Sequence, residues 1–163
     1  MAEPQGFREF VVARQNALLR TAWLLTGNWQ DAEDLVQVAL VKSWRHWRRV
    51  SAAGDPYGYV RQVLVTSHIS WRRRRWHTEL PVDELPESPA MDEFAGVQLR
   101  DALARVLPRL GARQRAVLVL RFYEDMPVEQ VAALLGISQG TVKSQTSKAL
   151  AQLARAQELE GIR

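Results

Sequence analysis

The stretch VEQVAALLGISQGTVKSQTSKAL, residues 128–150, decides the fold of the C-terminal part of this chain. Ala132 is small where two helices approach closely, Gly136 permits the left-handed conformation of a tight turn, and Ser138 is a favourable N-cap for a following helix. The apolar positions that pack around this turn are Val131, Leu135, Ile137 and Val142. The spacing predicts a helix-turn-helix, and an ordinary helical hairpin with a solvated polar face is the alternative.

The second helix of this motif presents a polar outer face. Its side chains are able to hydrogen-bond to bases or phosphates: Gln139, Thr141, Lys143, Ser144, Ser147 and Lys148. No acidic residue lies between Glu129 and Glu158, which favours a polyanionic partner. Gln145 and Thr146 are polar where such a helix often carries Arg and Leu, so we expect its inner packing to be looser.

Charge is distributed unevenly along the 163 residues, whose net charge is +4. Residues 1–77 carry 12 basic and 6 acidic side chains, residues 78–93 carry 6 acidic side chains and no basic one, and residues 94–163 carry 10 basic and 6 acidic ones. The middle segment also contains three prolines, which keep a chain extended. This pattern predicts two basic modules that meet polyanions, joined by an acidic linker.

Apolar residues recur with helical spacing almost throughout, and no stretch alternates as a strand does. We expect helices over residues 7–25, 31–48, 56–76, 94–106 and 112–123, followed by a short pair that ends near Gln157. Gly27 and Asn28, which both tolerate the left-handed conformation, are expected to end the first helix, and Val50–Pro56 is expected to form a loop.

All six tryptophans precede the acidic segment, which favours two separate cores. The predicted fold is therefore all-α, with small helical domains at residues 6–77 and 94–160 joined by the linker 78–93. In the second helix Asp31, Glu33 and Asp34 crowd the first turn, where carboxylates suit the positive end of the helix dipole.

The stretch WRRRRWH, residues 71–77, places four arginines between two indoles at the end of the third helix. Arginine pairs with phosphates and stacks on bases, and tryptophan offers a stacking platform for unpaired bases. Trp71 lies on the apolar stripe of its helix, and Trp76 is the more exposed candidate. We interpret the stretch as a nucleic-acid site, with a solvated basic face as the alternative.

Composition excludes several kinds of site. The chain lacks cysteine, which excludes disulfides, thiolate metal sites and a cysteine nucleophile. No apolar stretch reaches the roughly 20 residues that span a bilayer, and the N-terminus lacks the apolar core of a secretory signal, so we expect a cytoplasmic protein. An enzyme built on His46, His68, His77 and the acids of residues 31–34 is the weaker hypothesis, because no metal-binding spacing or glycine-rich phosphate loop supports it. We expect no catalytic residue, metal or cofactor.

Several features follow one another along the chain: DAEDLVQVAL (residues 31–40), DPYGYVRQVLV (residues 55–65), the basic helix end, the acidic linker and GTVKSQTSKAL (residues 140–150). In this order they resemble the extracytoplasmic-function (group 4) sigma factors of the sigma-70 family, in particular the actinobacterial sigma-E type. The resemblance covers residues 6–157. It implies a protein that binds bacterial core RNA polymerase, recognises the −35 and −10 promoter elements and promotes melting. A stand-alone helix-turn-helix regulator is the alternative.

The resemblance also implies roles for individual residues. Those expected to contact the clamp helices of the polymerase β′ subunit are Asp31, Glu33, Asp34 and Gln37. Those expected at the −10 element are Arg61, Thr66, Trp71, Arg72, Arg73, Arg74, Arg75 and Trp76. Those expected at the −35 element are Arg121, which would reach a phosphate, and Ser138, Gln139, Thr141, Lys143, Ser144, Ser147 and Lys148. The family's pocket for a flipped base corresponds to Val50–Tyr57.

Further partners implied by the resemblance are the polymerase β flap and, in some members, an anti-sigma factor. The sequence departs from the family at Thr66, where Asn is common, and at Gln145 and Thr146. These departures bear on the base preference at the −10 and −35 elements, respectively. The acidic linker resembles the segment that the family threads through the RNA exit channel.

Overall fold

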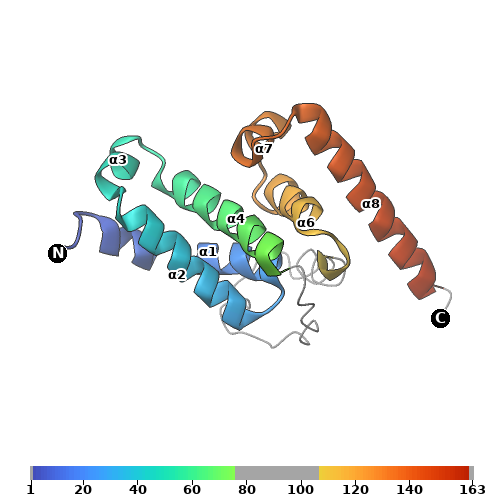
Figure 1. The fold of residues 1–163 in the computed structure, drawn as a ribbon, viewed down its shortest axis with the longest axis horizontal. Helices are drawn as coiled ribbons and strands as arrows, with labels where there is room; N and C mark the ends of the chain where they lie inside the picture. Colours follow the sequence, from blue (N-terminus) through green and yellow to red (C-terminus); the bar gives the residue numbers. More distant parts are fainter. Residues whose placement is uncertain (1, 76–106, 162–163) are drawn as a thin grey trace. The chain divides into compact units, whose positions relative to one another are not determined.

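The computed structural model describes residues 2–75 and 107–161, with side chains through residue 74 in the first range and through residue 155 in the second. Every regular element in these ranges is helical, which confirms the predicted all-α fold (Figure 1). The chain divides into two compact units, Met1–Glu93 and Phe94–Arg163. None of the described helices is both long and apolar enough to cross a membrane.

Some predictions concern residues outside the described ranges. These are the helix over residues 94–106, the acidic linker 78–93, and the side chains of Arg75, Trp76 and His77.

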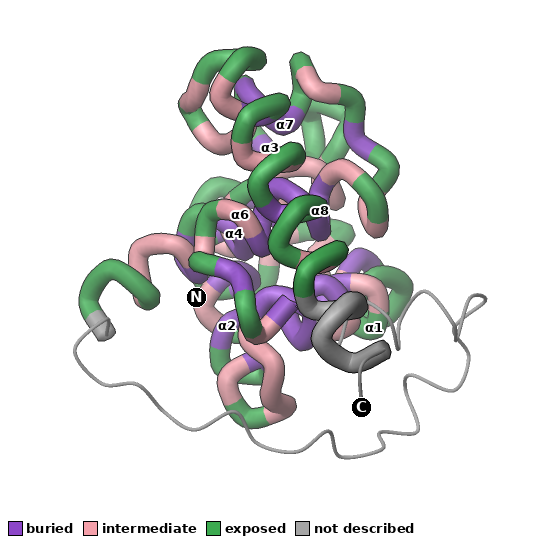
Figure 2. Tube along the Cα trace, turned by 90° about the vertical axis from the view of Figure 1, so that its right-hand side faces the viewer, coloured by how far each residue is buried: buried purple, intermediate pink, exposed green. Residues whose placement is uncertain are grey.

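Three helices build the first unit: α1 (Phe7–Thr26), α2 (Trp29–Trp44) and α4 (Pro56–Arg75). They lie side by side, and α2 runs opposite to its two neighbours (Figure 1). Buried and exposed positions alternate along each helix, as an amphipathic helix requires (Figure 2). The shared core contains Leu18, Leu35 and Leu64, each with 0% exposure. Burial of one such side chain contributes about 1.5–3 kcal/mol.

The turn between α1 and α2 uses Gly27 and Asn28 in different ways. Gly27 takes the left-handed conformation with φ 83°, and its N–H donates to the carbonyl of Trp23 at 2.8 Å, as predicted. Asn28 instead is extended, with φ −145°, and its side-chain oxygen accepts from the N–H of Asp31 at 2.8 Å. The prediction that Asn28 ends α1 is therefore wrong, because its amide caps the start of α2.

The predicted helix over residues 31–48 is divided in the structure. A second helix, α3 (Trp47–Ala52), follows α2 after a turn at Arg45 and His46. The turn lets Trp47 bury its indole against Phe7 and Phe10, with ring centroids 5.2 and 5.0 Å away. If α2 continued straight, the Trp47 indole would lie on the apolar face of α2 instead of against Phe7 and Phe10.

The expected loop over Val50–Pro56 is correspondingly shorter. Val50 is buried and helical in α3, and only residues 53–55 lie between α3 and α4. Asp55 caps α4, because its Oδ1 accepts from the N–H of Gly58 at 3.0 Å. Pro56 occupies the first helical position, where a missing N–H costs nothing.

The second unit begins in the described part with a 3₁₀ turn, η2 (Leu107–Arg109), and α6 (Ala112–Leu118). The predicted helix over residues 112–123 changes character at Val119. It continues as a π-helical segment, η3 (Val119–Tyr123), in which the N–H of Glu124 donates to the carbonyl of Val119 at 2.9 Å. The wider turn is followed by Asp125, whose φ of 56° is left-handed.

The helix-turn-helix consists of α7 (Val128–Leu135) and α8 (Gln139–Gly161). Gly136 turns the chain with φ 66°, and Val131 and Val142 are fully buried, as predicted. Leu135 and Ile137 are half-buried rather than enclosed. The second helix is longer than predicted, since α8 has 23 residues and ends at Gly161. Its C-terminal half is rich in Ala, Leu and Gln, which are strong helix formers.

Candidate nucleic-acid interface

The outer face of α8 carries the cations and hydroxyls that the sequence predicted. Gln139, Lys143, Ser144, Ser147 and Lys148 are all exposed. On the opposite side Val142 and Ala149 are fully buried, which fixes the rotation of the helix about its axis. The polar residues are three or four positions apart or adjacent, so they form one continuous strip along the first three turns.

Ser138 and Thr141 play a different part from the rest of the predicted set. The Oγ of Ser138 accepts from the N–H of Thr141 at 3.0 Å and lies 2.8 Å from the Thr141 Oγ1. This confirms Ser138 as the N-cap of α8. The two hydroxyls are thus engaged with each other, and Thr141 is half-buried.

Gln145 and Thr146 are both half-buried in α8, but they differ in hydrogen bonding. The Thr146 hydroxyl donates to the carbonyl of Val142 at 2.7 Å, one turn earlier in the helix. The Oε1 of Gln145 is buried and has no hydrogen-bond partner among the described residues. An unpaired buried amide oxygen destabilises the fold by about 1–3 kcal/mol.

Arg121 lies in η3, and its guanidinium makes a hydrogen bond within the protein. One of its guanidinium nitrogens, Nη1, donates to the carbonyl of Met126 at 2.9 Å across the turn that leads into α7. The side chain is half-buried. A guanidinium has five N–H donors, so this contact leaves donors for a phosphate while it holds the turn in place.

In the first unit, α4 carries the predicted −10 residues from Arg61 to Arg75, and Trp76 lies outside the described residues. Thr66 is exposed, and its hydroxyl donates back to the carbonyl of Gln62 at 2.9 Å, so its oxygen can still accept a hydrogen bond from a partner. Trp71 is half-buried near the end of the helix. The next three arginines are exposed and make no ion pair within the described residues: Arg72, Arg73 and Arg74.

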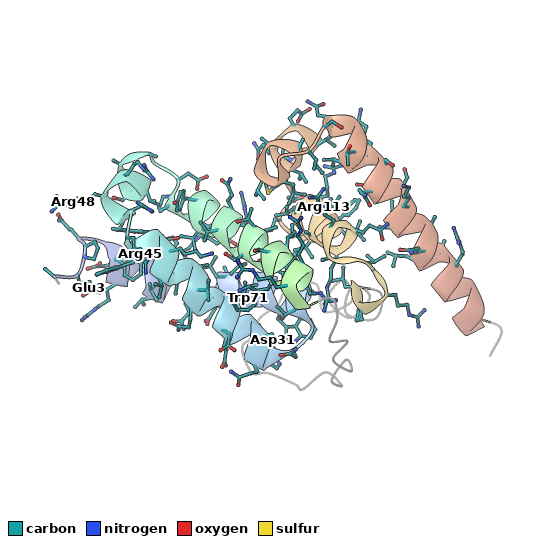
Figure 3. All side chains as sticks on the ribbon, in the orientation of Figure 1. Glu3, Asp31, Arg45, Arg48, Trp71 and Arg113 are labelled. Carbon is teal, nitrogen blue, oxygen red and sulfur yellow. The ribbon has the colours of Figure 1, made fainter. Side chains whose placement is uncertain are left out.

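The predicted polymerase-binding acids lie at the start of α2. Asp31 is half-buried, and its Oδ2 accepts from the side-chain amide of Asn28 at 2.9 Å. Glu33, Asp34 and Gln37 are exposed. Figure 3 shows Asp31 and Trp71 at the same end of the first unit, because α2 and α4 run in opposite directions.

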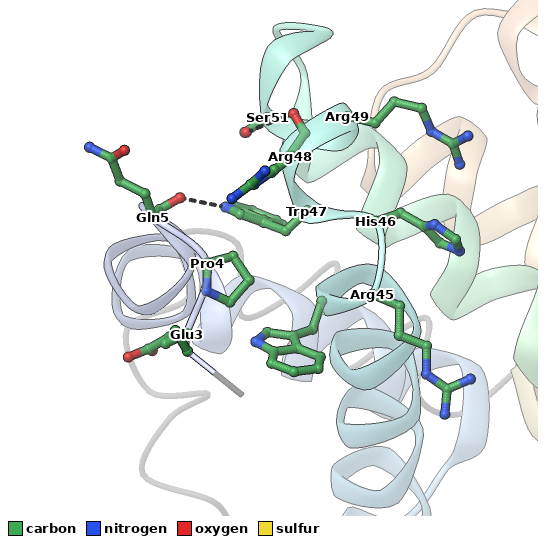
Figure 4. Close-up of a pocket in the computed structure, with 11 residues that line it drawn as sticks. Glu3, Pro4, Gln5, Arg45, His46, Trp47, Arg48, Arg49 and Ser51 are labelled. Carbon is green, nitrogen blue, oxygen red and sulfur yellow. Dashed lines mark hydrogen bonds between the residues drawn. The ribbon is translucent and has the colours of Figure 1, made fainter.

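Sequence reasoning missed a basic group at the other end of this unit. The stretch WRHWRR, residues 44–49, interleaves arginines with indoles much as residues 71–77 do. It lines an open pocket of about 990 Å³ together with the N-terminal residues 2–5. The exposed side chains of Arg45, His46 and Arg49 extend to one side of the chain in Figure 4. The alternation of tryptophan and arginine in residues 44–49 is visible in the sequence. Because one continuous helix was predicted over residues 31–48, the sequence did not indicate that this group forms a separate site.

The same pocket shows how the N-terminal segment is held. The indole Nε1 of Trp47 donates to the carbonyl of Gln5 at 3.0 Å (Figure 4). Arg8 forms an ion pair with Glu3 at 3.0 Å. The hydrogen bond of Trp47 thus joins α3 to the N-terminal segment.

The hypothesis of an enzyme site gains no support from the described residues. His46 is exposed, His68 is buried in α4, and the acids of α2 begin about 20 Å away from His46 by the rise of a helix. No group of three His, Asp or Glu side chains in the described ranges is arranged to hold a metal ion.

Comparison with known proteins agrees with this arrangement. Residues 10–78 match the family Sigma-70 region 2, and residues 106–155 match Sigma-70, region 4. The RNA polymerase sigma-E factor of Streptomyces coelicolor is 41% identical over 153 residues, which cover 94% of this chain and 86% of that protein. The ECF RNA polymerase sigma factor SigL of Mycobacterium tuberculosis is 31% identical over 141 residues, which cover 83% of this chain and 80% of the relative.

Solved structures share the fold. The sigma factor RpoE of Bartonella quintana, in complex with the anti-sigma factor NepR, superposes with a TM-score of 0.73 at 24% identity, covering 95% of this chain and 98% of that one. CnrH, in complex with the cytosolic domain of CnrY, superposes with a TM-score of 0.61 at 20% identity, covering 94% of this chain and 88% of that one. By its two matched regions and its curated relatives, the chain belongs to the extracytoplasmic-function sigma factors of the sigma-70 family.

Proposed function

We propose that this sigma factor holds promoter DNA at two points and is itself held by core RNA polymerase, with each contact made by a separate helix face. The observation that carries the proposal is the exposed polar strip of α8. The strip begins directly after the turn of the helix-turn-helix, where Ser138 caps α8. An α-helix with its side chains is about 10–12 Å wide, which fits the B-DNA major groove of about 12 Å.

The strip of α8 reads the −35 element in this proposal. Gln139 and Lys143 lie on the first turns, the part of such a helix that contacts base edges. Lys148 and Ser147 lie farther along and reach phosphates. Ser138 and Thr141 act indirectly, since their mutual hydrogen bond holds the start of the helix.

The end of α4 captures the −10 element as single-stranded DNA. Exposed Arg72, Arg73 and Arg74 supply positive charge, and Trp71 supplies an aromatic surface at the same place. Base stacking on an aromatic side chain contributes about 1–3 kcal/mol per base. Melting costs about 1.4 kcal/mol of stacking per base-pair step. Capture of a few bases is therefore enough to offset the opening of a few pairs.

The exposed side of α2 binds the polymerase β′ clamp helices. Its polar contacts are Glu33, Asp34 and Gln37, and Asp31 acts mainly as part of the helix cap. Val41, which is 52% exposed one turn beyond Gln37, adds an apolar contact to this face. Exposed apolar side chains beside polar ones are typical of protein interfaces.

In this proposal the polymerase catalyses RNA synthesis. This protein acts by binding alone, without a covalent step or a cofactor. Domains at residues 6–77 and 94–160 act in the cytoplasm, and the linker 78–93 joins them on the enzyme. Polymerase tethers both domains at the promoter spacing, which raises the effective concentration of the second contact once the first has formed. Since RpoE of Bartonella quintana was solved with the anti-sigma factor NepR, an anti-sigma protein is a further proposed partner.

Run-off transcription with purified core polymerase on a randomised promoter library tests the proposal. We expect transcripts only when this protein is present, with two enriched elements at a fixed spacing. Lys143→Gln should change the enriched bases of the upstream element alone, and Thr66→Ala those of the downstream element alone. Arg8→Gln, which removes an exposed charge from the first turn of α1, is the matched control and should change neither.

The outcome that contradicts the proposal is equally definite. Tight, sequence-specific binding to duplex DNA by the isolated protein, without association with core polymerase, would instead identify a stand-alone regulator.

A further inference from the structure

Two arginines from different helices meet at one aromatic ring at the start of α4. The guanidinium carbon of Arg14, in α1, lies 4.0 Å from the centroid of the Tyr57 ring. That of Arg61, one turn along α4, lies 5.4 Å from the same centroid. The two cations are therefore no farther apart than the sum of these distances.

Of the two cations, Arg14 is the one open to a further partner. Contact with the half-buried Tyr57 ring contributes about 0.5–1 kcal/mol and orients the guanidinium without neutralising its charge. Arg14 is exposed, and no carboxylate pairs with it among the described residues. Asp55, the acid beside Tyr57 in the sequence, uses its Oδ1 to cap α4. The charge of Arg14 is therefore available to an anion from a binding partner.

The surroundings indicate which anion fits. Arg45, in the turn before α3, and Arg48 and Arg49 of α3 are exposed and precede the start of α4, so this end of the unit is positive overall. A phosphodiester accepts paired N–H donors from a guanidinium, and stacking on an aromatic ring orients the guanidinium before binding. Contact with the ring therefore lowers the entropy that Arg14 would lose on binding a phosphate.

We propose that Arg14, positioned by the ring of Tyr57, binds a backbone phosphate of the single-stranded −10 DNA. The contact extends the DNA-binding surface from α4 onto α1, a helix to which no DNA contact has been assigned above. The inference rests on the proposed function of α4 as the −10 site. Arg61, already placed in that site, is the second guanidinium of the pair.

The test measures how salt weakens DNA binding by holoenzyme. Core polymerase is loaded with wild-type or variant protein and titrated with a fluorescent non-template strand that carries the −10 element of a promoter the wild type transcribes. Loss of one phosphate contact by Arg14→Gln should reduce the slope of log affinity against log salt by about 0.7. Between about 50 and 200 mM salt this corresponds to a loss of affinity about 2.6-fold smaller than for wild type.

Two further variants separate a phosphate contact from other effects. Arg14→Lys keeps the charge and should keep the wild-type slope, even where it binds less tightly. Arg8→Gln removes an equal charge from the same helix, nearly two turns before Arg14, and should leave the slope unchanged. Thermal melting by tryptophan fluorescence checks that each variant is folded.

The inference and the proposed function fail in different ways. A wild-type slope in Arg14→Gln, or an equal fall in Arg8→Gln, overturns the inference while transcription by the wild type upholds the function. A lowered melting temperature with an unchanged slope assigns Arg14 only a structural contact between α1 and α4, and also overturns it. If wild-type holoenzyme transcribes no promoter, the proposed function fails and this inference fails with it.

Discussion

The first turn of α4 contains a contact whose energy a double-mutant cycle should reveal. Oδ1 of Asp55 caps the helix by accepting from the N–H of Gly58. A Cβ placed on Gly58 would overlap Oδ2 of Asp55 and lie 2.8 Å from its Cγ. Alanine at position 58 must therefore push the Asp55 side chain out of its capping position.

Two opposing effects set the magnitude. Loss of the cap costs about 1 kcal/mol, and replacement of glycine by alanine inside a helix gains about 0.5–1 kcal/mol. Gly58→Ala should therefore leave the free energy of unfolding nearly unchanged in the wild-type background. In the Asp55→Ala background no cap remains to be lost, so the same substitution should stabilise by about 0.5–1 kcal/mol. The coupling between the two sites is about 1 kcal/mol.

The assay uses the fact that all six tryptophans lie within residues 1–77, so their fluorescence reports the first unit. A change of 1 kcal/mol shifts the melting temperature of a unit of this size by about 4–8 °C. We expect Asp55→Ala to melt about 4–8 °C below wild type and the double variant to recover about half of that or more.

Gly140→Ala is the matched control, in the first turn of α8. A Cβ there would lie 3.8 Å from the Ser138 Oγ, which is an ordinary contact. This substitution should therefore raise the free energy of unfolding by the whole of the roughly 0.5–1 kcal/mol that alanine gains over glycine in a helix, as measured by a melt followed by circular dichroism. The reasoning is refuted if Gly58→Ala raises the melting temperature equally with and without Asp55.

Three further changes test the second unit. Asp125→Gly relieves the left-handed φ of 56° and should stabilise by up to about 1 kcal/mol in a melt followed by circular dichroism; a lower melting temperature would contradict this. Gln145→Leu removes the unpaired buried Oε1 and should stabilise by about 1 kcal/mol or more, whereas destabilisation would mean that this oxygen is satisfied. Lys148→Gln should reduce the salt slope of holoenzyme binding to duplex −35 DNA by about 0.9, and an unchanged slope would exclude a phosphate contact there.

Much of the candidate interface was predictable because its residues are close together in the sequence. The polar strip of α8 repeats at helical spacing, and the cations of residues 72–75 are consecutive. Gly136 and Ser138 act within their own turn, so their roles follow from local geometry, and the structure confirms both.

Other features were not predictable because they depend on contacts between distant segments. The break after α2 exists because Trp47 packs against Phe7 and Phe10 and bonds to Gln5, and no periodicity within residues 31–48 signals that contact. The partial engagement of Arg121 depends likewise on the path of the turn that brings the Met126 carbonyl within 2.9 Å.

The sequence by itself determined the helical fold, the helix-turn-helix and the family, because each follows from residue types at short, regular spacing. Only the tertiary structure decided which of the charged residues are committed within the protein and which remain open to partners. Asp55 caps α4 and Asp31 bonds to Asn28, the cap of α2, so both are committed locally, whereas Glu33 and Asp34 face solvent. Arg14 reaches the Tyr57 ring across two helices because α1 and α4 pack together, and packing is set by side chains that lie far apart in the chain.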